Sequence, residues 1–443
     1  MSTLMVGVGR ANITPDYSVP LAGYGNTRFR MSEGAYDPQF STCIAFTDEA
    51  GETVLLFHND LTNTSNRVMA LRPAISEATD VPEDHILISA THNHSAPDVN
   101  SSLDIMNRYL VDLGRWMTEA ALKAMADRKP ANEMFVTSTQ VIGVNFTRHY
   151  VMDDGSICGD NLSGTGTKVV GHVNEPDHTL SLVKITREGG KDVVIANFQA
   201  HPHSGGGANK PYITSDMVGA MRDMMERDAD CKFLYFSGGS GNVNSHSRIK
   251  EENVVKTYIA RGQHLAMAAM RAAADYKKVD IGNIRITVTQ FEEEINHTED
   301  YKIEDARRIA RLWATTNDRL RCVREGKDVG IYSPYHANAI CAKFNEPKSW
   351  TLENVCVFSI GEVAFAIVPY EMFHEMGRYI REHSPFASTI IATIANGNYV
   401  YHPTKEAYEF HAYESCLTRA KPGEAEKQAE AYVKLLEGIY SAD

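Results

Sequence analysis

Short apolar segments alternate along the whole chain with amphipathic segments. Segments rich in Val, Ile and Phe and bounded by turn residues predict strands, at Cys43–Thr47, Thr53–Phe57, Ile86–Ala90, Met134–Thr139, Leu180–Ile185, Val193–Phe198, Phe233–Phe236, Ile284–Thr289, Val355–Ile360, Ala364–Val368 and Thr389–Ile394. Apolar positions near a 3.6-residue period predict helices, at Ser65–Thr79, Met106–Arg128, Met217–Arg227, Val254–Asp275, Ile303–Arg324, Glu371–His383 and Glu424–Tyr440. The alternation predicts an α/β fold in which a large mixed β-sheet system is flanked by helices. Because no repeat or linker interrupts the 443 residues, we expect a single domain over residues 1–443.

The charge balance excludes several classes of partner. The chain has 44 Lys and Arg against 57 Asp and Glu, a formal net charge of −13, and no basic run. This balance argues against a nucleic-acid partner and against docking on an anionic membrane. No apolar stretch approaches the ~18 residues of a membrane-spanning helix, and the first ten residues lack a secretory pattern. We therefore expect a cytoplasmic protein with a small-molecule substrate, for which a homo-oligomer is compatible with its size.

The cysteines do not indicate a structural metal or disulfide framework. There are seven of them, widely spaced, and none forms a CxxC motif. An odd count without paired spacing argues against a zinc finger, a thioredoxin-like redox site and a disulfide scaffold.

Two predicted strands each end in a His-x-His pair. The strand Ile86–Ala90 is followed by His92 and His94, and a second strand is followed by His201 and His203. In an extended segment residues i and i+2 share a face, so each pair can point into one cavity. Because imidazole is the commonest metal ligand in proteins, the two pairs predict a metal site.

A carboxylate is the expected companion of these histidines. Glu371 is the best candidate, since it follows the strand Ala364–Val368 and opens the predicted helix Glu371–His383, whose N-terminus would stabilise a negative charge. A catalytic zinc with His and carboxylate ligands keeps one position open for water and lowers its pKa to about 7. The predicted cofactor is therefore Zn²⁺, one ion per chain, although another divalent transition metal would suit the same ligands.

A glycine-rich stretch, Ser237–Ser245, follows the strand Phe233–Phe236. Glycines allow the backbone to approach a ligand and leave N–H groups for an oxyanion. We expect the polar end of a substrate to be positioned by Gly239, Ser240, Gly241 and Asn244. Two long loops, Tyr150–Glu175 and Ser204–Ser215, are expected to shape specificity.

Taken in order, these motifs resemble the N-terminal catalytic domain of the neutral/alkaline (non-lysosomal) ceramidase family. The resemblance spans nearly the whole chain. The matching segments are Gly7–Pro15, Leu21–Gly25, Thr91–Ser95, Asn145–Arg148, Ala200–Pro202, Ile213–Asp216, Gly239–Asn244, Pro369–Glu371, Asn398–Val400 and Tyr413-Glu414.

The resemblance implies an amide-cleaving, zinc-dependent enzyme and assigns residue roles. It implies four zinc ligands, His92, His201, Glu371 and Tyr399. It further implies that His94 contacts the substrate and moves protons, that Arg148 is the pocket arginine, and that Tyr413 polarises the scissile carbonyl.

The chain also departs from the family pattern. Asn244 occupies the position of a serine to which a catalytic role has been assigned in the family, so a serine acyl-enzyme is not expected, whereas a metal-activated water needs no serine. We also expect the family's C-terminal immunoglobulin-like domain to be absent. The predicted reaction is hydrolysis of an amide, ester or lactone of a small polar substrate. The alternatives are a metal-dependent isomerase, epimerase or lyase acting on a sugar or polyol derivative, a true ceramidase, and a metal-holding protein without catalysis.

Overall fold

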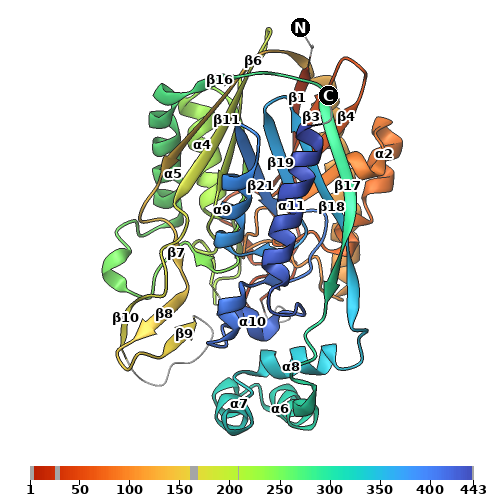
Figure 1. Ribbon diagram of the computed structural model, residues 1–443. Helices are drawn as coiled ribbons and strands as arrows, with labels where there is room; N and C mark the ends of the chain where they lie inside the picture. The colour runs from red at the N-terminus through yellow and green to blue at the C-terminus, as the bar shows by residue number, and fades with distance from the viewer. Residues whose placement is uncertain (1–3, 25–29, 160–167, 208, 442–443) are drawn as a thin grey trace.

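Two β-sheets pack face to face, and helices cover both outer surfaces (Figure 1). The computed structural model describes residues 4–24, 30–159, 168–207 and 209–441. The central apolar core joins side chains of the two sheets, among them Phe46 of the larger sheet and Phe358 and Phe365 of the smaller one. The predicted α/β class with a large mixed sheet system is confirmed.

The larger sheet has nine strands within the described residues, in the order β14-β12-β11-β6-β1-β3-β4-β5, with β16 also paired to β6. Most neighbours are antiparallel, but β12 pairs with β14 and β4 pairs with β5 in parallel. The bounds are β1 (Met5–Asn12), β3 (Phe40–Thr47), β4 (Thr53–Asn59), β5 (Ile86–Ala90), β6 (Lys129–Gln140), β11 (Thr179–Arg187), β12 (Val193–Phe198), β14 (Lys232–Ser237) and β16 (Lys277–Val279).

The smaller sheet has the order β17-β18-β19-β21. Its strands are β17 (Ile284–Glu294), β18 (Ser349–Ile360), β19 (Val363–Val368) and β21 (Ser388–Thr393). The strands β19 and β21 pair in parallel, with β21 at one end of this order. β19 is apolar throughout and fully buried, as expected of a strand buried on both faces.

Three pairs of helices cover the sheets. The larger sheet carries α2 (Arg72–Thr79) and α3 (Asp104–Ala126) over one half, and α4 (Asp216–Asp228) and α5 (Tyr258–Ala272) over the other half. The smaller sheet carries α9 (His374–His383) and α11 (Glu424–Tyr440). Gly9 of β1 allows α3 to approach closely, because a side chain there would collide with the backbone of Ala120.

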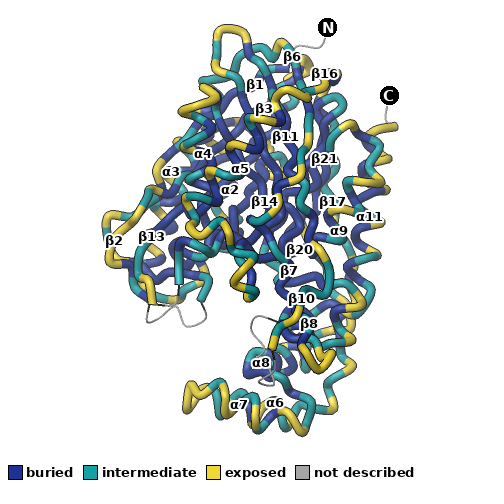
Figure 2. The backbone as a smooth tube through the Cα atoms, turned by 90° about the vertical axis from the view of Figure 1, so that its left-hand side faces the viewer, coloured by how far each residue is buried: buried dark blue, intermediate teal, exposed yellow. Residues whose placement is uncertain are grey.

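Further elements lie at one end of the molecule. Helices α6 (Ile303–Thr316), α7 (Arg319–Gly326) and α8 (Pro334–Lys343) form a separate apolar cluster, largely exposed on its outer side (Figure 2). Small strands lie at the same end or along its edge: β2 (Gly34–Ala35), β7 (Phe146–Thr147), β8 (His149–Met152), β9 (Ile157–Gly159), β10 (Val169–His172), β13 (Tyr212–Ile213), β15 (Val243–Asn244), β20 (Glu371–Met372) and β22 (Tyr401–His402). The remaining short helices are α1 (Asn66–Met69) and α10 (Tyr413–Leu417).

Two predicted helices are each divided in the structure. Residues 65–79 form α1 and α2, because Pro73 in the first turn of α2 cannot continue a preceding helix. Residues 303–324 divide between α6 and α7, since Asn317 adopts a left-handed conformation (φ 50°) and Asp318 then caps the second helix. Both breaks depend on the conformation of single residues, which the spacing of apolar residues does not predict.

The predicted loop Tyr150–Glu175 contains a small three-stranded sheet, β10-β8-β9. Residues 160–167 of this segment, and residue 208 of the predicted loop Ser204–Ser215, lie outside the described residues.

Candidate metal centre

His92 lies just beyond the end of β5. It is buried and its backbone is left-handed, with φ of 66°, so the extended geometry assumed from the sequence ends at Ala90. A positive φ at a residue with a side chain is strained, and such residues gather at functional sites. The Nδ1 atom lies 2.8 Å from the Thr62 carbonyl oxygen, which fixes the ring and directs Nε2 into the interior.

His201 reaches the same place from β12. Its backbone bridges to Asn244 of β15, and its Nδ1 atom lies 3.0 Å from the Val243 carbonyl oxygen. The His92 and His201 rings are 4.5 Å apart between centroids. Each ring thus donates Nδ1–H to a backbone carbonyl and leaves Nε2 for another partner, the arrangement usual for metal-ligating histidines.

Glu371 completes the cluster from the smaller sheet side. Its Oε2 atom is 3.3 Å from Nε2 of His92 and 3.3 Å from Nε2 of His201. Burial raises the pKa of this carboxyl. The interactions with His92 and His201 lower it by more, so the pKa lies well below its usual range. The carboxylate is therefore ionised and faces two imidazole nitrogens.

The position of Glu371 differs from the sequence prediction. It does not open a helix; it belongs to β20, pairs in parallel with Tyr401 of β22, and donates its N–H to the Val400 carbonyl at 2.7 Å. The helix α9 begins only at His374. The carboxylate is held by strand pairing and by the two histidines rather than by a helix N-terminus.

The chemistry of these atoms fits a divalent metal ion. Beyond the 3.3 Å contacts within the cluster itself, His201 Nε2 and Glu371 Oε2 are buried and have no hydrogen-bond partner among the described residues. A buried polar atom without a partner costs about 1–3 kcal/mol, so a ligand that engages both is favourable. Two imidazole nitrogens and a carboxylate oxygen form a common protein donor set for catalytic zinc.

His94 belongs to the same cluster. Its Nε2 atom is 3.2 Å from Nε2 of His92, and the ligand atoms of His92, His94 and His201 all lie within 4.8 Å of one another. Burial, together with the neighbouring histidines, lowers the pKa of His94 well below its ordinary value. A neutral imidazole here can accept a proton or ligate a metal.

Tyr399 and Tyr401 point to different places. The Tyr399 hydroxyl accepts the Glu353 N–H at 3.4 Å and its ring packs on Trp350, so it is not brought to the histidine cluster. Tyr401 instead pairs with Glu371 through the backbone and lies near the Arg148 guanidinium, 5.3 Å from the ring centroid. The positive φ of Val400, 66°, breaks the strand alternation that would give the two tyrosines one face.

Arg148 and Tyr413 lie beside this cluster. The Arg148 guanidinium donates from Nε to Glu414 Oε1 at 2.5 Å and from Nη2 to the Gly241 carbonyl at 2.6 Å. Its carbon is 5.9 Å from the centroid of the Tyr413 ring. Burial disfavours the Arg148 charge, but the Glu414 carboxylate outweighs burial and raises its pKa well above the ordinary value. Two of its N–H groups are therefore occupied by protein acceptors.

Glu414 is the functional-site residue whose role the motifs did not reveal. It is buried and also accepts a hydrogen bond from His149 Nε2 at 2.8 Å. The only signal in the sequence was its place directly after Tyr413.

The glycine-rich stretch packs against the segment that carries Glu371. A side chain at Gly241 would approach the Glu371 carbonyl to 2.6 Å, and one at Gly239 would approach the Phe373 carbonyl to 2.7 Å. The Gly241 N–H donates to the Met372 carbonyl at 2.8 Å and is not free for an oxyanion. These glycines position the carboxylate through backbone contact, and a direct substrate contact remains a prediction.

The other two residues predicted in this stretch are also buried. The Ser240 carbonyl accepts the Val243 N–H at 2.9 Å, which closes the turn. Asn244 lies next to His201 through the isolated bridge between their backbones. Substrate contact by Ser240 or Asn244 remains a prediction as well.

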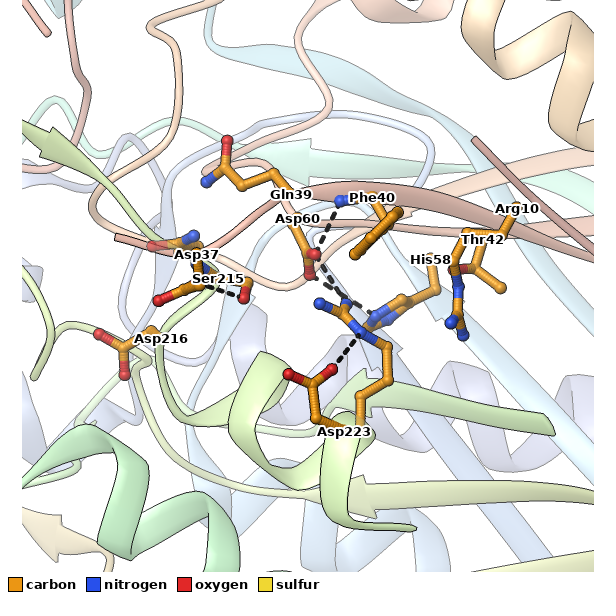
Figure 3. Close-up of polar contacts among 12 residues, drawn as sticks. Arg10, Asp37, Gln39, Phe40, Thr42, His58, Asp60, Ser215, Asp216 and Asp223 are labelled. Atoms are coloured by element: carbon orange, nitrogen blue, oxygen red, sulfur yellow. Dashed lines mark hydrogen bonds and ion pairs between the residues drawn. The ribbon is translucent and has the colours of Figure 1, made fainter. Parts of the chain in front are cut away.

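Two buried acids, Asp60 and Asp216, could hold a second metal together with His203, but both have other partners. Asp60 accepts hydrogen bonds from Arg222 Nη1 at 2.7 Å and from the Phe40 N–H at 2.9 Å. Figure 3 shows Asp60 beside Phe40. Asp216 accepts the backbone N–H groups of Gly205 and Met217. Within the described residues, neither acid joins His203 in a ligand group, and the group found is His92, His94 and His201.

Comparison with known proteins identifies the fold. No family model and no curated protein matches the sequence. The structure is similar to neutral ceramidase from Pseudomonas aeruginosa, with a TM-score of 0.70 and 16% identity over 99% of this chain and 75% of that chain. It is also similar to a ceramidase complexed with C2, with a TM-score of 0.71 and 14% identity over 99% of this chain and 76% of that chain. The expected resemblance is confirmed as a shared fold.

The helices give no sign of a membrane span. Among the described residues, none is both long enough and apolar enough to cross a bilayer.

Proposed function

We propose that this protein is a metal-dependent hydrolase that cleaves an amide bond, or a related ester or lactone bond. The observation that carries the proposal is the approach of Glu371 Oε2 to within 3.3 Å of Nε2 of both His92 and His201. A divalent ion such as Zn²⁺ held by these atoms would polarise a carbonyl and lower the pKa of a water molecule at neutral pH.

The residues around the donor set have separate tasks. His92, His201 and Glu371 would hold the metal, and Tyr401 replaces Tyr399 as the tyrosine proposed beside it. The neutral His94 ring would take a proton from the attacking water and pass it to the leaving group. The Tyr401 hydroxyl would help to orient the scissile group.

Tyr413 and Arg148 define the opposite wall of the site. The Tyr413 hydroxyl, whose pKa is raised chiefly by burial, stays protonated and can donate to a developing oxyanion. Arg148 supplies a fixed positive charge nearby, while its bonds to Glu414 and Gly241 make it equally a positioning residue.

The substrate is proposed to be small and polar, since the cavity next to His203 and the histidine cluster is walled mainly by polar and charged residues. Ceramide fits the structural neighbours equally well, since both are named ceramidases. An isomerase or lyase would use the same ligands, and the substrate panel below separates these reactions. A small-molecule substrate, a cytoplasmic location and the absence of nucleic-acid and membrane partners also remain proposals.

Elemental analysis of protein purified without chelators tests the centre. We expect about one transition-metal ion per chain, loss of that ion in His92→Ala and His201→Ala, and retention in the matched control His383→Ala. His383 is exposed and bonds only the Tyr379 carbonyl among the described residues. Full metal content in His92→Ala would contradict the assigned ligands.

Turnover is tested on a panel of small N-acyl amides, esters, lactones, ceramide and sugar acids. We expect hydrolysis of the small amides, which a chelator abolishes and added zinc restores. Turnover of ceramide alone would replace the proposed substrate class. Isomerised sugar acids without any hydrolysis would replace the proposed reaction.

A further inference from the structure

A cavity of about 460 Å³, lined mainly by polar residues, lies next to the candidate metal centre at His203. Its walls include Tyr24, His203, Ser204, His246, Lys256 and Arg261. His203 connects the two sites, since its ring centroid is 5.6 Å from that of His94 and 4.6 Å from that of His246. The two sites therefore share His203 as a common wall residue, and the cavity lies within one side chain of the centre.

Arg261 is the unusual member of the wall. It lies on α5, is only 4% exposed, and its Nε atom has no hydrogen-bond partner. Its one hydrogen bond within the described residues runs from Nη1 to the Lys256 carbonyl at 3.4 Å, and no described carboxylate lies within ion-pair distance. Burial accordingly lowers the pKa of its guanidinium. A buried guanidinium without an anionic partner is costly, and an anion would relieve that cost.

Two further cations face the same region. Lys256 is exposed, and its ammonium group has no partner in the described part of the chain. Arg30 is 5% exposed and bonds carbonyl groups and the Ser95 hydroxyl, but no carboxylate. Its guanidinium lies over the Tyr24 ring, 4.6 Å from the centroid. Arg261 and Lys256 thus bring two cationic side chains to the cavity wall, and Arg30 lies next to the wall residue Tyr24, although the whole chain is acidic.

The neighbouring acids form no ion pair with Arg261 within the described residues. Asp216 is the acid that acts electrostatically on Arg261. Its carboxylate accepts hydrogen bonds from the backbone N–H groups of Gly205 and Met217. Asp37 accepts hydrogen bonds from the hydroxyl groups of Thr214, Ser215 and Tyr258. Figure 3 shows Asp37 beside Ser215, with Asp216 apart from the Asp60 cluster. Both acids are engaged in holding the loop rather than in pairing with Arg261.

We propose that this cavity binds an anionic substituent of the substrate, a carboxylate, phosphate or sulfate, through Arg261 and Lys256. The proposal rests on the proposed hydrolase function and narrows its substrate class to acyl amides that carry an acidic group. Guanidinium groups bind such oxyanions through paired N–H donors, and a water-poor wall strengthens the contact.

Matched substrates test the proposal kinetically. An N-acetyl amino acid and its neutral carboxamide differ only in the charged group. We expect the acid to have at least about tenfold higher kcat/KM, since hydrogen bonds between two charged groups are stronger than those to a neutral amide. Lys256→Ala and Arg261→Lys should reduce that preference, while Lys434→Ala, an exposed lysine on α11, should not. Turnover of both substrates at equal rates would overturn the anionic subsite and leave the hydrolase intact.

A binding measurement decides the case in which neither substrate reacts. Inorganic phosphate is titrated into the metal-loaded protein by calorimetry, in parallel with the variants. We expect binding that Lys256→Ala and Arg261→Lys weaken several-fold and His92→Ala retains. Phosphate binding lost only in His92→Ala, or no binding at all, would overturn the proposal. Because this readout needs no turnover, its failure is distinguishable from the failure of the hydrolase.

Discussion

The carboxylate of Glu414 lies 2.5 Å from Nε of Arg148, and both side chains are buried. The two residues are 266 positions apart in the chain, so this contact joins α10 to the strand region beside β7. Arg148 continues the chain of bonds to the Gly241 carbonyl, and Gly241 contacts the backbone that carries Glu371. The ion pair therefore helps to hold the backbone that carries Glu371 in place.

Replacing Glu414 by glutamine should destabilise the fold. Removing one partner of a buried ion pair costs about 3–5 kcal/mol, because the other charge remains buried and uncompensated. We expect a clear fall in the thermal midpoint and in activity. The matched control is Glu119→Gln, an exposed residue paired with Lys123, where the change should be about 0.5 kcal/mol or less. Equal midpoints for the two variants would contradict the supporting role of the pair.

The pKa of Glu414 predicts how the free energy of unfolding falls at acid pH. Although burial raises the pKa of Glu414, the charges of Arg148 and His149 outweigh burial and lower it to about 2. A folded-state pKa below the unfolded value contributes stability above the unfolded pKa, which is lost as pH falls toward the folded pKa. From the ordinary value of about 4.3 this amounts to about 3 kcal/mol, lost between about pH 5 and pH 2. Urea unfolding across this range should show a steeper loss in the wild type than in Glu414→Gln.

Two neighbouring tyrosines provide a matched pair of variants. Tyr401→Phe removes a hydroxyl next to Arg148 and Glu371, whereas Tyr399→Phe removes one that contacts the Glu353 backbone. We expect Tyr401→Phe to lose about 10- to 100-fold in metal affinity or kcat, the usual effect of groups around a metal site. Tyr399→Phe should remain close to wild type. The reverse result would return the ligand role to Tyr399, as the motif resemblance first implied.

A single added methyl group should displace Glu371. In Gly241→Ala the new carbon would lie 2.6 Å from the Glu371 carbonyl, so the backbone must shift. Overpacking of this kind costs about 1–3 kcal/mol, and metal affinity should fall with it. Gly438→Ala, at an open position in α11, should instead stabilise the protein by about 0.5–1 kcal/mol. Unchanged metal binding in Gly241→Ala would show that the glycine does not position the carboxylate.

Much of the architecture was determined by the sequence alone, because strand and helix periods are local. The strands β5 and β12 have the predicted bounds, and so does the helix α11. The two His-x-His pairs could be found because each follows an apolar strand directly. Their shared location was an inference from strand ends. It holds for His92, His94 and His201, although His92 is not extended, whereas His203 lies outside that ligand group of the described residues.

Other features were decided only by the tertiary structure. Glu371 was predicted at a helix terminus, but pairing with β22 makes it a strand residue. Strand alternation would place the side chains of Tyr399 and Tyr401 on the same face. The left-handed backbone of Val400 between them directs the two side chains to different places, which the sequence pattern does not predict. The role of Glu414 depends on an arginine 266 positions away, and the unpaired Arg261 is revealed only when the packing of α5 is known. Local patterns encode which elements form, whereas backbone reversals and long-range charge pairing depend on the whole folded chain.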